Sequence, residues 1–245
     1  MITIISPAKN MKVREREGLL ISESGFRRKT ETVMETLKKC TPWELESYMK
    51  INEKLAGQAF VDIQAFAMEK KGTAALLTYD GLVFKHTEAI EWNEEDLAYA
   101  QEHLRILSAC YGSLKPLDGI QPYRLEMQCK IPVEGKSLYE FWGDDLYKDV
   151  YKENKVVLNL ASEEYAKCVR KYAKYDIFID VEFLNLHKGK LKTLATLAKM
   201  ARGHMVQYVM KNRVDDPKEI KSFDWNGYAY EPSLSNEKKY VFVAR

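Results

Sequence analysis

The sequence predicts one α/β (α+β) domain over residues 1–245, with a mixed central sheet flanked by helices and a helical insertion near the N-terminus. Three observations lead to this prediction. Short apolar runs at 2–5, 104–109 and 156–160 are typical of buried strands. Stretches with helical spacing and good capping residues lie between these runs. No repeat, low-complexity tract or linker divides the chain.

Composition limits the class of protein. With 245 residues, 46% of them hydrophobic, the chain is long enough to bury a large core. No run approaches the roughly 20 apolar residues of a membrane span, and the apolar start of the chain is too short for a signal peptide. We therefore expect a cytoplasmic protein without a membrane partner.

Net charge is low. The formal charge is +2 and the pI is about 8.2, whereas a dedicated nucleic-acid-binding domain often has a pI above about 9. Any basic surface must therefore come from clustering of lysines and arginines.

Cysteine and histidine spacing gives no metal motif. The four cysteines are far apart and form no C-x-x-C pair, and the four histidines show no ligand spacing. We expect reduced, mostly buried thiols, no metal site and no cofactor.

The first predicted strand, 2–5, ends at Ser6 and Pro7, which start a turn. Lys9 then lies near the strand's carboxyl end, which is where open α/β sheets bind ligands. The alternative is a solvated lysine that follows a turn.

Two consecutive helices are well signalled after a first helix at about 26–40. Thr41, Pro42 and Glu44 form a capping box at the start of one helix, and Asn52 caps the next. Their short connection would suit a helix-hairpin-helix, in which Lys50 and Lys54 add charge beside helix amides that bind a phosphate. Such hairpins are usually glycine-rich and this one is not, so an ordinary pair of packed helices is the alternative.

The rest of the chain alternates between strands and helices. We expect strands at 74–79, 104–109, 156–160 and 177–183, helices at 93–103, 137–150, 193–212 and 217–223, a further helix that begins at Ser162, a tight turn at 188–190, and a terminal hairpin of 228–230 with 240–243. Ser162 is the expected cap of its helix. Because Glu163 and Glu164 follow it and would repel an anion, we predict no phosphate site there.

A loop at 107–127 is the most informative stretch. Two glycines and two prolines indicate a rigidly shaped connection. It also carries polar side chains suited to a binding site, namely Tyr111, Lys115, Asp118, Tyr123, Arg124 and Glu126. The alternative is that Asp118 caps a turn, that Arg124 and Glu126 pair with neighbours and that the tyrosines pack.

The same loop resembles the signature of the YaaA-like peroxide-stress protein family through its sequence YGSLKPLDGIQPYRLEM. Further blocks continue in the family's order at 6–9, 41–57, 138–143, 159–165 and 198–203. The resemblance implies one large compact domain, a role in peroxide stress, DNA binding and a helix-hairpin-helix. The chain departs from the family at 81–84, where the acid that usually follows the glycine is missing.

No catalytic motif is present: there is no Walker loop, G-x-G-x-x-G, G-x-S-x-G or H-E-x-x-H. Cys110 has no assignable base, and the family commonly has leucine there. We therefore assign no catalytic residue and lean against an enzyme.

Positive residues in the family-like blocks are the binding candidates. They are Lys9, Lys115, Arg124, Lys199 and Arg202, which together would form a cationic cleft for phosphates. Tyr111 and Tyr123 would stack on bases, and Asp118 and Glu126 would orient the arginines. The alternative is that these charges form buried ion pairs that hold the loop.

Two functions follow from this cleft. The first is a peroxide-stress protein that binds DNA through its phosphates, with distorted duplex as one form, and limits iron and peroxide damage without catalysis. The second is an enzyme acting on a small phosphorylated or nucleotide-like ligand around Arg124 and Glu126. A purely structural or partner-binding role is a third.

Overall fold

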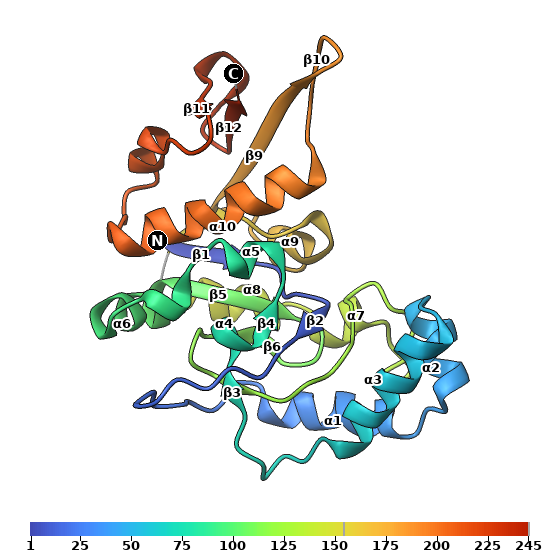
Figure 1. Ribbon diagram of the computed structural model, residues 1–245. Helices are drawn as coiled ribbons and strands as arrows, with labels where there is room; N and C mark the ends of the chain where they lie inside the picture. The colour runs from blue at the N-terminus through green and yellow to red at the C-terminus, as the bar shows by residue number, and fades with distance from the viewer. Residues whose placement is uncertain (154, 245) are drawn as a thin grey trace.

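The computed structural model describes residues 1–153 and 155–244 (Figure 1). Among them, eight strands form one central sheet. In spatial order these are β11 (Tyr228–Tyr230), β12 (Lys239–Ala244), β9 (Ile177–His187), β8 (Val156–Asn159), β1 (Ile2–Ile5), β5 (Leu104–Ser108) and β6 (Gly112–Leu114), while β10 (Lys190–Lys192) pairs with the end of β9.

The sheet is mixed, as predicted. β12, β9, β8, β1 and β5 run parallel to one another, whereas β11, β6 and β10 are antiparallel to their neighbours. Every residue of β1 is buried, and Thr3 of this strand is level with Leu104 on one side and Leu158 on the other. The carboxyl ends of β1 and β8 therefore open onto the same edge of the sheet.

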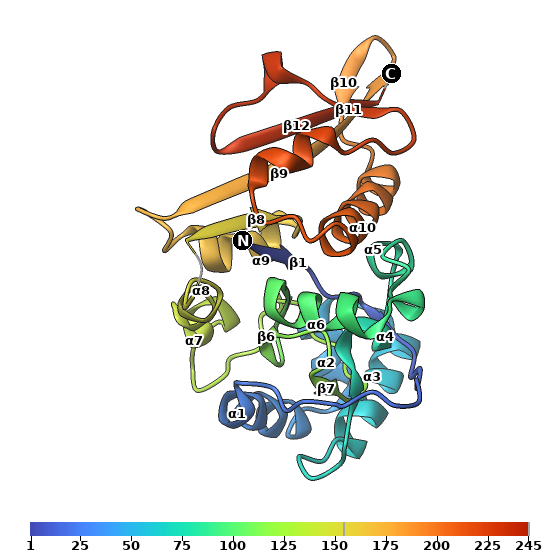
Figure 2. The same ribbon diagram turned by 90° about the vertical axis from the view of Figure 1, so that its left-hand side faces the viewer.

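Helices cover both faces of the sheet. Figure 2 shows α8 (Asp145–Val150) and α9 (Glu163–Arg170) on one side and α6 (Glu94–His103) and α10 (Ala195–Lys211) on the other. α10 packs against α6, β9 and the short helix α5 (Leu82–Lys85). Further short helices are α7 (Leu138–Trp142), η1 (Ala89–Glu91), η2 (Pro217–Ser222) and η3 (Pro232–Leu234). The single α/β domain that the sequence predicts is thus confirmed.

The predicted helical insertion lies between β1 and β5 in the chain and comprises α1 (Arg27–Lys38), α2 (Pro42–Met49) and α3 (Glu53–Ala65). Its caps are as predicted: Thr41 and Glu44 form a capping box, and the Asn52 side chain accepts the Leu55 N–H at 3.0 Å. Between α2 and α3, Lys50 adopts a left-handed conformation with φ 51°. This short turn contains no glycine.

The strand predicted at 74–79 is wrong. The segment contains β3 (Thr73–Ala74), the helical turn α4 (Ala75–Thr78) and β4 (Tyr79–Asp80). The Thr78 hydroxyl donates to the Ala74 carbonyl at 2.8 Å, which closes the turn and lets a fully buried apolar run be helical. β3 pairs with β7 (Gly119–Ile120), and β4 with β2 (Asn10–Met11).

Two other expectations are corrected. The helix expected at 137–150 is divided into α7 and α8 at Gly143, which has φ 52°. Ser162 does not cap α9 with its side chain; its hydroxyl instead accepts from Ser6 Oγ at 3.0 Å. This bond ties the end of β8 to the end of β1.

All four cysteines are free and buried, as predicted. Among the described residues, no helix combines the length and apolar character needed to cross a membrane.

A histidine pair joins α5 to α10. His86 Nδ1 and His204 Nε2 lie 3.0 Å apart, so one ring donates a proton to the other, and Trp225 stacks on His204 with 4.4 Å between ring centroids. Burial lowers the pKa of His204, and the neighbouring His86 lowers it further, against opposing contributions from Gln207 and Glu88. The folded protein therefore favours neutral His204.

This pair predicts a loss of stability in acid. Because the pKa of His204 is lower in the folded than in the unfolded protein, the stabilisation is present above about pH 6.5 and is lost as pH falls through the lowered pKa of the folded protein. We expect His204→Phe, which keeps a ring on Trp225, to flatten this part of the stability–pH curve measured by urea unfolding. The exposed His187 provides the control as His187→Gln, and an unchanged curve in His204→Phe would contradict the assignment.

Candidate functional site

A cavity of about 440 Å³ lies at the carboxyl ends of β1 and β8. Its walls come from segments that are distant in sequence: the turn after β1, the β4–α5 junction, the loop after β7, the start of α9, and α10. The residues that carry polar or charged groups into the cavity are Ser6, Lys9, Asn10, Asp80, Tyr123, Arg124, Glu126, Ser162, Glu164, Tyr165, Lys199 and Arg202. This is the edge at which open α/β sheets commonly bind ligands.

The loop that supplies Arg124 and Glu126 is held by a buried hydroxyl network. Ser108 Oγ, at the end of β5, accepts the N–H groups of Cys110 and Tyr111 at 3.1 and 2.9 Å. It also lies 2.7 Å from the Tyr123 hydroxyl, which in turn lies 2.7 Å from that of Tyr79. Tyr123 is thereby fixed in the cavity wall, with its hydroxyl in the core.

Glu126 organises the cations near the cavity mouth. Its carboxylate is 2.6 Å from Lys9 Nζ and 3.8 Å from an Arg124 guanidinium nitrogen. Glu126 and Arg124 are 11% and 14% exposed at their side chains, whereas Lys9 is 63% exposed. Arg124 Nε is buried and has no hydrogen-bond partner among the described residues. Arg124 therefore enters the cavity with part of its donor capacity unused.

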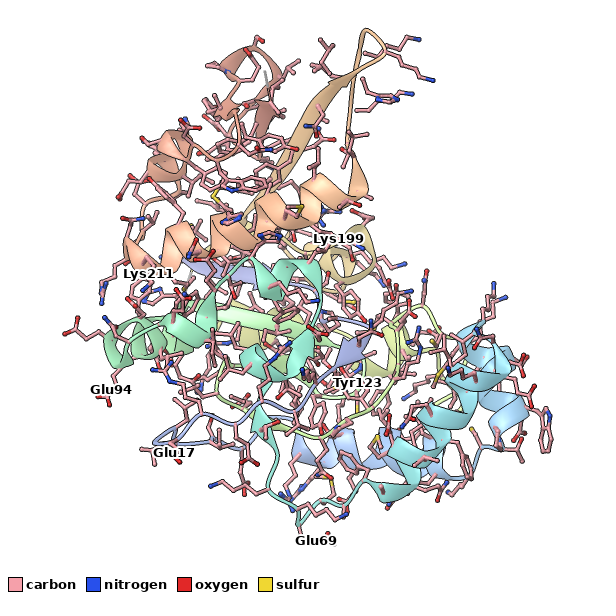
Figure 3. The ribbon with its side chains drawn as sticks, in the orientation of Figure 1. Glu17, Glu69, Glu94, Tyr123, Lys199 and Lys211 are labelled. Carbon is pink, nitrogen blue, oxygen red and sulfur yellow. The ribbon has the colours of Figure 1, made fainter. Side chains whose placement is uncertain are left out.

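Arg202 and Lys199 form the opposite wall. Both lie on α10, and Figure 3 shows Lys199 on this helix above the segment that carries Tyr123. Among the residues that the structure describes, no hydrogen bond or ion pair satisfies either side chain, and Arg202 Nε is buried. Burial lowers the pKa of Arg202, and the negative charge of Glu182 opposes this shift. A partly buried guanidinium without a bound carboxylate is costly, and it is a ready site for an anion.

Glu164 adds a second carboxylate from the first turn of α9. Its Oε1 accepts the Gln128 N–H at 3.1 Å. Burial raises the pKa of Glu164, and the negative charge of Glu126 raises it further. The protonated form of Glu164 is therefore favoured more than in a solvent-exposed glutamate, and in that form the carboxyl group can donate as well as accept a hydrogen bond.

The structure brings six of the sequence-predicted residues together at the cavity: Lys9, Tyr123, Arg124, Glu126, Lys199 and Arg202. It places five elsewhere, and the turns of the loop explain three of them. The Asp118 carboxylate accepts the Lys115 N–H at 2.8 Å and the Ser22 hydroxyl at 2.7 Å, so it closes a turn instead of orienting an arginine.

Lys115 and Tyr111 point away from the cavity. Lys115 Nζ lies 3.8 Å from Glu102, and the Tyr111 hydroxyl accepts the Gln121 N–H at 2.9 Å beside a second cavity. The remaining two candidates, Lys50 and Lys54, are exposed at the α2–α3 turn and do not line the cavity.

Sequence reasoning did not select Ser6, Ser162 or Glu164 for the site. The signal was present, because Ser162 and Glu164 follow a buried strand just as Lys9 does. The Ser162 N–H and hydroxyl both bond to Ser6 Oγ, at 2.8 and 3.0 Å, which brings the two strand ends together. Chemically, the cavity combines unpaired cations on one wall with carboxyl groups on the other, so it suits a ligand that has both an anionic group and hydrogen-bond donors.

The unpaired charge of Arg202 predicts a stability cost. Replacing it with methionine, which fills a similar volume without charge, should raise the free energy of unfolding by about 0.5–2 kcal/mol. The matched control is Arg170→Met on α9, because Arg170 bonds to Glu163 and to Asp180, both at 2.6 Å. We expect this control to lose roughly 1 kcal/mol. Urea unfolding measures both, and destabilisation by Arg202→Met would mean that Arg202 serves the fold.

Comparison with known proteins identifies the family. The family model described as peroxide stress protein YaaA matches residues 1–234. A UPF0246 protein of Agathobacter rectalis is 41% identical over 244 residues, which cover 99% of this chain and 98% of that protein. A UPF0246 protein of Clostridioides difficile is 41% identical over 245 residues, and one of Crocosphaera subtropica is 37% identical over 251, each with at least 99% of both chains covered. The chain therefore belongs to the YaaA family of peroxide stress proteins.

Proposed function

We propose that this protein acts in peroxide stress by binding DNA at the cavity, through phosphate groups, and that it limits iron- and peroxide-dependent damage without catalysis. The observation that carries the proposal is Arg202, whose guanidinium has no hydrogen bond or ion pair within the described part of the chain. The family's description as a peroxide stress protein supports the physiological role.

Phosphate is the anion that best suits this wall. A guanidinium offers a planar set of donors that matches two phosphate oxygens, and Lys199 adds a mobile point charge one helical turn away. Lys9 is exposed at the mouth, where a backbone passing over the cavity would meet it. Glu126 holds Lys9 and Arg124 in place, so the carboxylate need not contact the nucleic acid.

Binding of this kind predicts a particular salt dependence. Loss of one phosphate contact should weaken binding alike for all sequences, by about tenfold near 0.1 M salt, and lower the slope of log K against log salt by about 1. We expect this result for Arg202→Met when labelled duplex, single-stranded and mismatched DNA are titrated by fluorescence anisotropy from about 50 to about 200 mM salt.

The matched control for this titration is Arg28→Met. Arg28 is exposed on α1 and lies outside the cavity. Arg28→Met removes the same charge as Arg202→Met, so a general electrostatic effect on binding would appear in both variants. Equal affinity and slope for folded Arg202→Met and the unaltered protein would reject the assignment of Arg202 to the DNA site.

A second function is favoured by the size of the cavity. A volume of about 440 Å³ is within the usual range of small-ligand sites, roughly 300–1,000 Å³. Glu126 and Glu164 line the cavity together with Lys199 and Arg202. Their carboxylates could accept hydrogen bonds from the hydroxyl or amino groups of a sugar or base. The corresponding proposal is an enzyme acting on a small phosphorylated or nucleotide-like ligand around Arg124 and Glu126.

A thermal-shift screen of nucleotides and inorganic phosphates tests this alternative. A ligand at about 100 times its Kd stabilises the native state by about 2.7 kcal/mol, which is roughly 5–10 °C for a chain of this size. The small-ligand proposal expects one nucleotide to give such a shift and Arg202→Met to remove it. Absence of any shift across the screen would count against the enzyme.

A further inference from the structure

The hairpin formed by β9 and β10 projects beyond the rest of the sheet. Within the described part of the chain, β12 pairs with β9 as far as Asn185, and β9 continues to His187 before the chain turns back into β10. Lys188 and Gly189 make the turn, with φ of 51° and 73°, a pair of positive values typical of a tight two-residue hairpin turn. Figure 1 shows this hairpin rising from the top of the molecule, on the side to which β1 points.

Positive charge is concentrated in this part of the chain. Residues 183–214 contain seven lysines and arginines and no aspartate or glutamate, although the whole protein has a net charge of only +2. Lys188, Lys190 and Lys192 lie in the hairpin and are exposed, and among the described residues none of them makes an ion pair or hydrogen bond through its side chain. Their charges are free to meet an external anion.

The hairpin also has an exposed apolar pair. Leu186 and Leu191 are directly opposite each other in the ladder, so both side chains lie on one face. They are 68% and 42% exposed. Lys190 pairs with His187 on the other face. A two-stranded ribbon with cations on one face and an apolar pair on the other is unusual on a free surface.

Alternation along β9 places the apolar face on the side of the cavity. Leu186 and Glu182 are four residues apart in the strand and therefore point to the same face. Glu182 is the charge that acts on Arg202 in the cavity wall. The hairpin then leads directly into α10, which carries Lys199 and Arg202.

From these observations we infer that the β9–β10 hairpin is a DNA-binding arm that holds the duplex beside the cavity. Lys188, Lys190 and Lys192 contact phosphates, and the pair of Leu186 and Leu191 packs against bases that are exposed where the duplex is distorted. Two-stranded ribbons fit the grooves of DNA, and apolar side chains are known to insert at unstacked steps. This inference rests on the proposed function, because it extends the same DNA contact.

The first experiment removes the hairpin charges from the full-length protein. We expect Lys188→Gln, Lys190→Gln and Lys192→Gln combined to weaken binding of a fully paired duplex by about 10- to 100-fold near 0.1 M salt and to lower the salt slope by about 2–3. The matched control combines Lys136→Gln, Lys155→Gln and Lys218→Gln, which removes the same charge from exposed positions outside the hairpin. The control should change affinity by less than about threefold. Thermal unfolding verifies that both variants are folded.

The outcomes separate this inference from the proposed function. If the hairpin variant binds like its control while Arg202→Met still weakens binding, the arm is rejected and DNA binding at the cavity stands. If the unaltered protein binds no DNA at about 50 mM salt, both are rejected. Binding to vesicles containing phosphatidylserine that depends on the three lysines, with unchanged DNA affinity, would instead make the hairpin a contact for anionic membranes and overturn the inference.

A second variant tests the apolar pair. Leu186→Ser with Leu191→Ser keeps all the lysines, so fully paired duplex should bind within about threefold of the unaltered protein. Affinity for the same duplex with a two-base mismatch should fall by about tenfold, since stacking on an exposed base contributes a free energy of this order. An unchanged preference between the two duplexes would show that the leucines do not contact bases.

Discussion

The arrangement of the cavity depends on the hydroxyl of Ser108, where β5 ends. This oxygen accepts two backbone N–H groups, from Cys110 and Tyr111, so both of its lone pairs are used and its own proton is the one shared with the Tyr123 hydroxyl. The turn into β6 and the ring of Tyr123 are fixed together. Because Arg124 and Glu126 follow within three residues, their positions in the cavity wall are set by a buried network in which a lost partner would be costly.

The unpaired guanidinium of Arg202 in the cavity wall is a place where the fold is less stable than it could be. Glu126 pairs with Lys9 and Arg124, while Arg202 on the facing helix receives no carboxylate, although Glu126 and Glu164 line the same space. A sequence selected only for folding would replace such a guanidinium or pair it. Positions that break the local rules in this way are the ones at which function is expected, and Arg202 is the clearest of them in the described chain.

The sequence predicted the framework and about half of the candidate site, for reasons that individual residues make clear. Capping residues and strand ends are local signals, so Thr41, Asn52 and the position of Lys9 were predictable. Side-chain direction within the loop depends on tertiary pairing. The loop's early part turns back as β6 beside β5, which directs Lys115 towards Glu102, and no local pattern encodes this. Glu164 was missed because acidic residues at the start of a helix argue against an anion site. The groups that act on Glu164, such as Glu126 and Lys9, come from other segments of the chain, and local sequence does not reveal them.

The relation between the hairpin and the cavity favours an extended ligand over a small one. Arg202 and Lys199 alone would serve a nucleotide as well as a DNA backbone, because both present a phosphate of the same size. The lysines of the hairpin do not line the cavity, so a ligand confined to the cavity would not contact them. In Figure 1 the hairpin and the α2–α3 pair, with Lys50 and Lys54 at its turn, lie towards the two ends of the molecule on the side of the carboxyl end of β1. A polyanion longer than the cavity could contact cations distributed in this way, and this distribution is the physical reason why we propose DNA ahead of a free nucleotide.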